Sequence, residues 1–315
     1  MLPELNQVHV DQMPAGESPR HKSHLRVVPP PPPSPPTVTR PEKARPRSKI
    51  ARLLDTVARN EHGYDPAAYD LEFTRQVADK GWKVFGPGRY FDTHARGFEN
   101  IPKDRPVMMV SNHSGGTIAP DVWGLGLEWY RHFGFSRPLY ILAHEMIFTL
   151  PFFARQFEKI GALRASQDVA RRIVESGRDV LVYPGGDRDV WRPYSKRWKV
   201  DFYGRTGFSK LAKEMDMPIV PVAHAGSHEG MRVLTDGQSI AEAVGLKRIC
   251  RVQIWPIALM LPWGLALGPL PHLPPPGRYR YLIGESITPN RDPGTVALDA
   301  QHAVQRQLTQ LEREG

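Results

Sequence analysis

The stretch VMMVSNHSGG, residues 107–116, passes from four apolar residues into a polar turn that ends in two glycines. The apolar run predicts a short buried strand over Val107–Val110. His113 lies in the turn, and Ser114 and the glycines leave open space beside its imidazole. Because α/β folds place ligands and chemistry at the carboxyl ends of their strands, His113 is a candidate catalytic residue.

Strands and helices alternate on both sides of this stretch. Apolar patterns predict further strands over residues 90–98, 139–142, 180–183, 219–222 and 281–287. Helical patterns fill the intervals over residues 120–130, 146–157, 170–175 and 207–215. This alternation predicts an α/β fold with a mixed, mostly parallel central sheet covered by helices. We assign it to a single domain over residues 85–290, followed by a C-terminal helix over residues 291–315.

The N-terminal part differs in composition from the rest of the chain. Residues 1–48 are rich in proline, with an unbroken run from Pro29 to Pro33, and are predicted to form a disordered tail with polyproline II character. Residues 49–84 are predicted to form two amphipathic helices, the second over residues 67–84. Their spacing leaves open whether they pack on the domain or lie on a membrane.

The chain has 42 Lys and Arg residues against 33 Asp and Glu residues, and its net charge of +9 suits an anionic partner. A lipid surface fits better than nucleic acid, because the sequence has no basic recognition helix, aromatic-studded sheet or zinc-ligand spacing. The single cysteine, Cys250, and the lack of a secretory signal pattern favour a reducing compartment. We therefore expect a peripheral or interfacial protein at the cytoplasmic face of a membrane.

Residues 254–276 are apolar enough to suggest a membrane span, but they contain seven prolines. Each proline removes a backbone donor and disrupts helical hydrogen bonding, which argues against a spanning helix. Two alternatives stay open. The segment forms an irregular apolar wall over the core, or it inserts shallowly between acyl chains and headgroups, a position that suits Trp255 and Trp263.

Several polar blocks follow the predicted strands. Asp121 comes shortly after His113, and a carboxylate bonded to one imidazole nitrogen leaves the other nitrogen as a base. Residues 161–166 are predicted to place Arg164 in a turn of small residues. Residues 183–189 (YPGGDRD) follow a strand, and their two glycines expose N–H groups to an anion. Residues 218–222 (PIVPV) form a proline-interrupted buried strand. Taken singly, these blocks also fit a surface histidine, a surface ion pair, a strand-end turn and a core strand.

In this order the four blocks resemble the glycerolphosphate/lysophosphatidic acid acyltransferase superfamily. The resemblance covers about residues 85–290. It looks closest to the diacylglycerol-acyltransferase-like, mycobacterial-type branch, because of YPGGDRD at 183–189 and FYGRTGF at 202–208. It implies an O-acyltransferase that moves a fatty acyl group from acyl-CoA or an acyl carrier protein to a hydroxyl of a glycerolipid, at a membrane surface and without a metal or a further cofactor.

The resemblance also implies roles for individual residues. His113 would be the general base and Asp121 its partner. The loop around the base, which would include oxyanion donors, consists of Ser114, Gly115 and Gly116. Substrate-binding roles fall to residues of the second and third blocks: Arg164, Gly185, Gly186, Arg188 and Asp189. The two arginines would bind phosphate on the acceptor or the carrier, since a guanidinium suits that bidentate task.

Two departures from the family pattern leave alternatives open. The usual spacing has four residues between the histidine and the aspartate, whereas seven separate His113 from Asp121 and position 118 is Ile. The glutamate of the third block, associated with glycerophosphate recognition, is replaced by Gly185. A diacylglycerol or long-chain alcohol acceptor is therefore an alternative, as is a non-catalytic lipid-binding protein. A serine hydrolase using Ser114 is disfavoured, because the pattern Gly-x-Ser-x-Gly is absent.

Overall fold

The computed structural model describes residues 61–149, 151–243 and 254–315. The predicted proline-rich tail over residues 1–48, the first predicted N-terminal helix and Cys250 lie outside the described residues. Within the described residues, no helix is long and apolar enough to cross a membrane.

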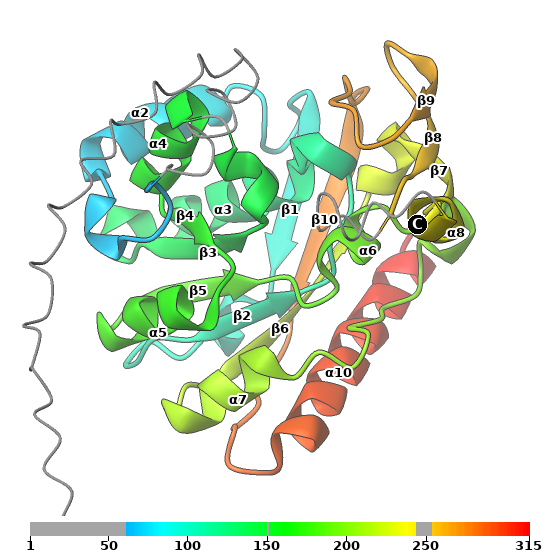
Figure 1. Cartoon of the computed structure of the whole chain (residues 1–315). Coiled ribbons are helices and arrows are strands. Elements are labelled where there is room, and N and C mark those ends of the chain that lie inside the picture. The colour runs from blue at the N-terminus through cyan, green and yellow to red at the C-terminus, as the bar shows by residue number, and fades with distance from the viewer. Residues whose placement is uncertain (1–60, 150, 244–253) are drawn as a thin grey trace, which may run out of the picture. The chain divides into compact units, whose positions relative to one another are not determined.

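A seven-stranded sheet organises the described part of the chain (Figure 1). Its order is β1 (Phe91–Arg96), β10 (Gly277–Ile283), β6 (Ile219–Ala225), β2 (Met108–Ser111), β5 (Asp179–Val182), β3 (Leu139–Ala143) and β4 (Ala162–Arg164). All neighbouring pairs are parallel except β10 and β6. The prediction of a mixed, mostly parallel sheet is confirmed, and β2, which leads to His113, lies in the middle.

Helices cover both faces of this sheet (Figure 1). One face carries α2 (Leu71–Gly81), α3 (Pro120–Phe133) and α4 (Pro151–Lys159), and the other carries α5 (Gln167–Glu175), α7 (Gly207–Glu214) and α10 (Pro293–Arg313). Two shorter helices are α6 (Gly186–Val190) and α8 (Gln238–Ala243). Single 3-10 turns are η1 (Pro66–Ala68), η2 (Phe98–Asn100), η3 (Gly116–Ile118), η4 (Gly134–Ser136), η5 (Glu145–Phe148), η6 (Tyr194–Lys196) and η7 (Ser227–Gly230).

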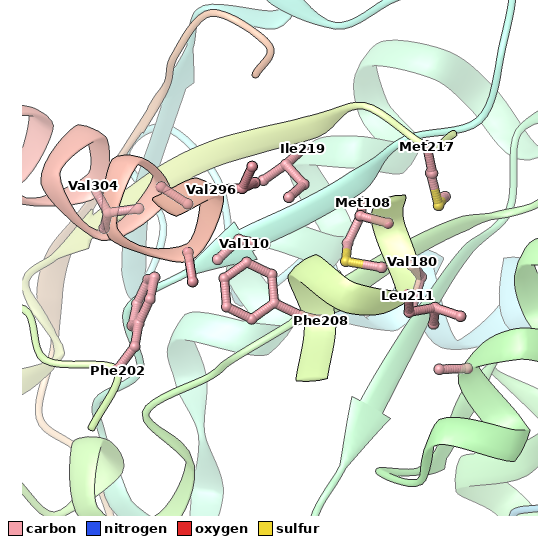
Figure 2. Close-up of a cluster of buried hydrophobic side chains, with 14 of the residues drawn as sticks. Met108, Val110, Val180, Phe202, Phe208, Leu211, Met217, Ile219, Val296 and Val304 are labelled. Carbon is pink, nitrogen blue, oxygen red and sulfur yellow. The ribbon is translucent and has the colours of Figure 1, made fainter. Parts of the chain in front are cut away.

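The two faces of the sheet have separate apolar cores. Met108 and Val110 of β2 point to one face, where they meet Phe208 of α7 and Val296 of α10 (Figure 2). Met109, between them in sequence, belongs to the other core with residues of α2 and α3. Alternation along a strand explains this division, because successive side chains point to opposite faces. A strand buried on both faces therefore reads as the continuous apolar run seen in the sequence.

The second predicted N-terminal helix and the predicted C-terminal helix belong to the same compact unit as the sheet. The second N-terminal helix is shorter than residues 67–84, because the Asp70 carboxylate accepts the Phe73 N–H at 3.0 Å and caps α2 there. The predicted C-terminal helix is α10, capped by Asp292 and packed on β6 and α7. The interval from Gly161 to Ser166, expected to be a turn, contains β4, whose three residues are buried and pair with β3.

Residues 254–276 are not irregular throughout, so that part of the first alternative was wrong. They contain β8 (Ile257–Met260) and β9 (Gly264–Leu267), an antiparallel hairpin that joins β7 (Arg232–Thr235) in a second, three-stranded sheet. Its inward side chains, Ala258 and Met260 among them, pack in a third apolar core. Prolines flank the two strands and leave their ladders intact, which is why counting prolines missed the hairpin.

The packing of α3 on the sheet predicts opposite effects for two neighbouring glycines. A Cβ added at Gly124 would lie 2.2 Å from Oη of Tyr281, whereas one at Gly126 would meet nothing within 4 Å. We expect Gly124→Ala to lower the free energy of unfolding by about 1–3 kcal/mol through overpacking. Gly126→Ala, the matched control in the same helix, should raise it by up to about 1 kcal/mol. Urea denaturation followed by circular dichroism measures both, and equal stability of the two variants would contradict this packing.

Candidate active site

His113 and Asp121 lie together despite their unusual spacing. His113 follows β2, and its Nδ1 is 2.7 Å from Oδ2 of Asp121. The extra residues form the η3 turn, after which Ala119 at φ 48° leads into α3. Pro120 occupies the first turn of that helix and Asp121 follows it. The longer loop is thus taken up by one tight turn, and the carboxylate still reaches the imidazole.

Asp121 is fixed from several directions. Its side chain has no exposed surface, and Oδ2 also accepts the Ser114 N–H at 3.0 Å. Its carbonyl oxygen accepts the Tyr281 hydroxyl at 3.0 Å, which ties the start of α3 to β10. The first turn of a helix favours negative charge, because its unpaired N–H groups form the positive end of the helix dipole. The site therefore holds an ionised carboxylate at a defined place.

The pKa values of the pair are displaced in opposite directions. Burial disfavours the charged imidazole, but the charge and hydrogen bond of Asp121 outweigh it and raise the pKa of His113 above its ordinary value. Burial likewise opposes ionisation of Asp121, yet the contact with His113 lowers the pKa of this carboxyl overall. An ionised carboxylate only accepts hydrogen bonds, so Nδ1 of His113 is the donor. Nε2 of His113 is left with the lone pair that a base requires.

The ring of His113 is held against Tyr183, at the end of β5. The two ring centroids are 4.5 Å apart with planes inclined by 31°. The histidine side chain keeps 17% of its surface exposed. It therefore remains accessible while its orientation is fixed by Asp121 on one side and Tyr183 on the other.

The two glycines after Ser114 are required by the backbone and by crowding. Gly115 has φ 96° and Gly116 has φ 62°, a region that side chains rarely adopt. A Cβ at Gly115 would lie 2.7 Å from Pro120 Cδ, and one at Gly116 would lie 2.9 Å from Met231 Sδ. The small residues predicted from the sequence thus bring bare backbone beside His113.

Asp189 occupies a different position from the substrate contact expected of it. It is fully buried, Oδ2 accepts the backbone N–H of His113 at 2.5 Å, and Oδ1 pairs with Arg192. A Cβ at Gly185 would lie 2.3 Å from Asp189 Cβ. A glutamate at position 185 would therefore collide with Asp189, which explains in steric terms why glycine stands there. In this chain the buried carboxylate of Asp189 holds the histidine loop.

The two arginines expected to bind phosphate are engaged with protein groups. Arg164, at the end of β4, is buried; it pairs with Glu145, and its Nε donates to the His62 carbonyl at 2.8 Å. Arg188, on α6, lies over the Tyr203 ring at 3.9 Å and donates to Gln238 at 3.2 Å. Neither is among the residues that line the cavity beside His113.

Ser114 belongs to a buried chain of hydrogen bonds rather than to a nucleophile pair with His113. Its hydroxyl lies 2.5 Å from that of Ser227, which lies 2.7 Å from Nε2 of His224. All three residues are at most 1% exposed. Burial lowers the pKa of His224 to about 4, so this imidazole is neutral near neutral pH. The arrangement fixes the loop and keeps the Ser114 hydroxyl away from substrate.

A cavity of about 490 Å³ opens beside His113. One face of α3 lines it through Val122, Trp123, Gly126 and Tyr130, and β3, α4 and α2 complete an apolar wall with Ile141, Phe157 and Val77 among others. Arg205 is the only arginine or lysine among the described residues that line it. Arg205 donates to the Pro184 carbonyl at 2.8 Å and lies 3.6 Å from Asp187. It stands in the FYGRTGF stretch, which the sequence singled out without assigning it a role.

Residues 92–225, from β1 to the end of β6, match the family model described as Acyltransferase. This stretch of the chain therefore resembles the acyltransferase family in sequence. The resemblance predicted from the four sequence blocks is therefore confirmed over this range, which contains His113, Asp121 and the third block.

Similar proteins extend the comparison. An uncharacterized protein of Mycobacterium tuberculosis is 29% identical over 238 residues, which cover 76% of this chain and 63% of that protein. The DGAT1/2-independent enzyme synthesizing storage lipids of Homo sapiens is 27% identical over 138 residues, covering 44% and 41%. The crystal structure of the 1-acyl-sn-glycerophosphate (LPA) acyltransferase PlsC from Thermotoga maritima gives a TM-score of 0.45 at 19% identity, covering 77% and 78%. The chain spans less than two thirds of the length of these curated relatives.

The coupling of His113 to Asp121 predicts the effect of removing the negative charge. Asn at position 121 keeps an acceptor oxygen but removes the negative charge that offsets burial of the imidazole, so Asp121→Asn should lower the pKa of His113. NMR titration of the imidazole measures this shift, and the acid limb of any pH–rate profile that depends on His113 should move to lower pH with it. Asp168→Asn, an exposed carboxylate on α5, is the control. An unchanged pKa in Asp121→Asn would contradict the coupling.

Proposed function

We propose that the chain is an O-acyltransferase that transfers a fatty acyl group from a thioester donor to the hydroxyl of a lipid acceptor. One observation carries the proposal: the His113–Asp121 pair lies beside an apolar cavity of about 490 Å³. Pockets of this size suit a hydrophobic small-molecule substrate whose reactive end meets a few polar groups. A base without a long apolar cavity would not call for a fatty substrate.

His113 would act as the general base. Nε2 takes the proton of the acceptor hydroxyl as its oxygen attacks the thioester carbonyl, and the thiolate leaves as the ester forms. Hydroxyls are weak nucleophiles near neutral pH, so a positioned base contributes on the order of 10²–10⁴-fold. Asp121 keeps the tautomer and stabilises the imidazolium that forms. The acyl group passes directly from donor to acceptor, without an acyl-enzyme.

The glycine loop would stabilise the oxyanion that develops on the carbonyl oxygen. The backbone N–H groups of His113 and Ser114 already donate to Asp189 and Asp121. The amides of Gly115 and Gly116, next along the loop, are the donors we propose. Their lack of side chains allows a thioester carbonyl to approach the backbone.

The apolar wall along α3 would hold the acyl chain. Residues from Ala119 to Tyr130 face the cavity at helical spacing, a length of about 16 Å at 1.5 Å per residue. His113 lines the same cavity. An acyl chain lying along α3 would therefore place its thioester next to the base.

A neutral acceptor fits this site better than a lysophospholipid. Arg164 and Arg188, the arginines at the positions that would bind phosphate, contact Glu145 and Tyr203 instead. Arg205, which does line the cavity, lies 3.6 Å from Asp187 and is partly neutralised by it. We therefore favour diacylglycerol or a long-chain alcohol as the acceptor, with acyl-CoA or an acyl carrier protein as the donor. The storage-lipid enzyme of Homo sapiens, similar over part of its length, supports this direction.

Replacing the base should slow turnover strongly without unfolding the protein. We expect His113→Ala to reduce kcat/KM by about 10²–10⁴-fold. Mass spectrometry of lipid products, with labelled acyl-CoA and a mixture of diacylglycerol, alcohol and lysophospholipid acceptors, measures the rate and identifies the acceptor. His94→Ala, an exposed histidine on β1, is the control. Full activity of His113→Ala would remove the proposed mechanism, and labelling of Ser114 by a fluorophosphonate would favour a hydrolase.

The length of the acyl chain should depend on Gly126. A side chain added there enters open space along the cavity wall. We expect Gly126→Leu to shift donor preference towards shorter acyl chains. The kcat/KM for a long-chain donor should fall at least about tenfold relative to a short one, because steric overlap of the leucine with the acyl chain costs about 1–3 kcal/mol. The short-chain rate is the internal control for folding. A uniform loss for all donor lengths would place the acyl chain elsewhere.

A further inference from the structure

The β8–β9 hairpin exposes an apolar surface that the proposed reaction does not use. Leu259, Leu261, Trp263, Leu265 and Leu267, here called the leucine face, are each between 45% and 59% exposed. Leu259 pairs with Leu265 across the two strands, and Leu261 and Trp263 lie at the tip. Figure 1 shows the hairpin at the end of the domain beyond the main sheet, at the upper right. The exposed side chains therefore form one continuous patch on a projecting element.

The opposite side of the same hairpin is already buried. Ala258, Met260 and Ala266 pack with Trp191 and Met231. An antiparallel strand with one face on a core ordinarily carries polar side chains on the other face. Here both faces are apolar, so the inner face anchors the hairpin and the outer face is left for a partner. Contiguous exposed apolar patches of this kind mark interaction sites.

We infer that the leucine face inserts into the interfacial region of a phospholipid membrane. Residues 254–277 contain no Asp, Glu, Lys or Arg, so no charge opposes entry into the acyl boundary. Trp263 at the tip is the residue type that favours the headgroup level, and its indole N–H is satisfied within the hairpin by the Pro271 carbonyl at 2.6 Å. Arg232 is exposed on β7 opposite Leu259, where a cation meets anionic headgroups.

The chain that follows the hairpin also lines the cavity. The Thr117 hydroxyl donates to the Pro269 carbonyl at 3.0 Å, which joins the loop after His113 to the chain after β9. Pro269 and Ile118 both line the cavity, and Ile118 is partly exposed. A membrane bound to the leucine face would bring lipid close to this part of the cavity wall. The inference rests on the proposed function for its use, since a lipid acceptor must leave the membrane to reach His113.

Vesicle binding by the purified full chain tests the surface. In flotation with vesicles of equal parts phosphatidylcholine and phosphatidylglycerol, the combined variant Leu259→Thr, Leu265→Thr and Leu267→Thr should bind about 100-fold more weakly, about fivefold for each leucine. Threonine keeps strand propensity at these exposed positions. Leu298→Gln, an equally exposed leucine on α10, should bind like the unaltered chain. Undiminished binding of the triple variant would overturn the inference.

A second readout does not depend on the triple variant being folded. Phospholipids brominated near the headgroup should quench the part of the tryptophan fluorescence that Trp263→Phe removes. No quenching of that component would overturn the inference. A dimer of the unaltered chain in light scattering that the triple variant lacks would also overturn it, by showing that a second copy covers the face.

The outcome for the surface is separable from the outcome for the chemistry. The triple variant should keep turnover of a short-chain thioester and a water-soluble alcohol while losing turnover of vesicle-borne acceptor. His113→Ala should bind vesicles normally and lose both activities. If the triple variant loses vesicle binding while His113→Ala remains fully active, the proposed function is overturned and the inference about the membrane surface is kept. If the triple variant binds vesicles fully while His113→Ala is inactive, the inference about the membrane surface is overturned and the proposed function is kept.

Discussion

A carboxylate without solvent must be stabilised by other groups to remain ionised, and Asp121 meets this condition through the imidazole of His113, the Ser114 N–H and the first turn of α3. These contacts fix where α3 begins. They also set the length of the loop after β2, because the η3 turn has to deliver the helix N-terminus to the histidine. The Tyr281 hydroxyl adds a link from the same residue to β10. The contacts of Asp121 therefore set both the position of α3 and the orientation of the His113 imidazole.

The pKa of a second buried carboxylate, Asp189, is displaced in the opposite direction to that of Asp121. Burial raises the pKa of Asp189, and Arg192 and the His113 N–H oppose that rise. It contacts the backbone of His113, whereas Asp121 contacts the ring. His113 is thus held by two independent hydrogen bonds, one from its backbone N–H to Asp189 and one from its ring to Asp121. This division allows the loop to stay in place while the imidazole gains and loses a proton, and it depends on glycine at position 185.

The sequence predicted the parts of the site that depend on local order. His113 follows an apolar strand and Asp121 opens a helix behind Pro120, so both lie at the same edge of the sheet. The arginines could not be placed this way, because Arg164 is oriented by Glu145 and the His62 carbonyl, both remote in sequence. Arg205 reaches the cavity through a bond to Pro184. The β8–β9 hairpin was missed because its buried positions carry small or apolar residues and its exposed positions carry leucines. Both faces of the strands are therefore apolar, and the sequence lacks the usual alternation of apolar and polar residues.

Helix α3 links chemistry to substrate size through its two faces. Asp121, Gly124 and Glu128 face β1 and β10, where Gly124 admits the Tyr281 ring and Glu128 accepts the Thr93 hydroxyl at 2.9 Å. The residues between them, including Val122 and Gly126, line the cavity. Substitutions on the cavity face change the space available to an acyl chain without touching the face that positions the base. The same fold can therefore vary its substrate along one side of a helix while the other side keeps the catalytic pair in register.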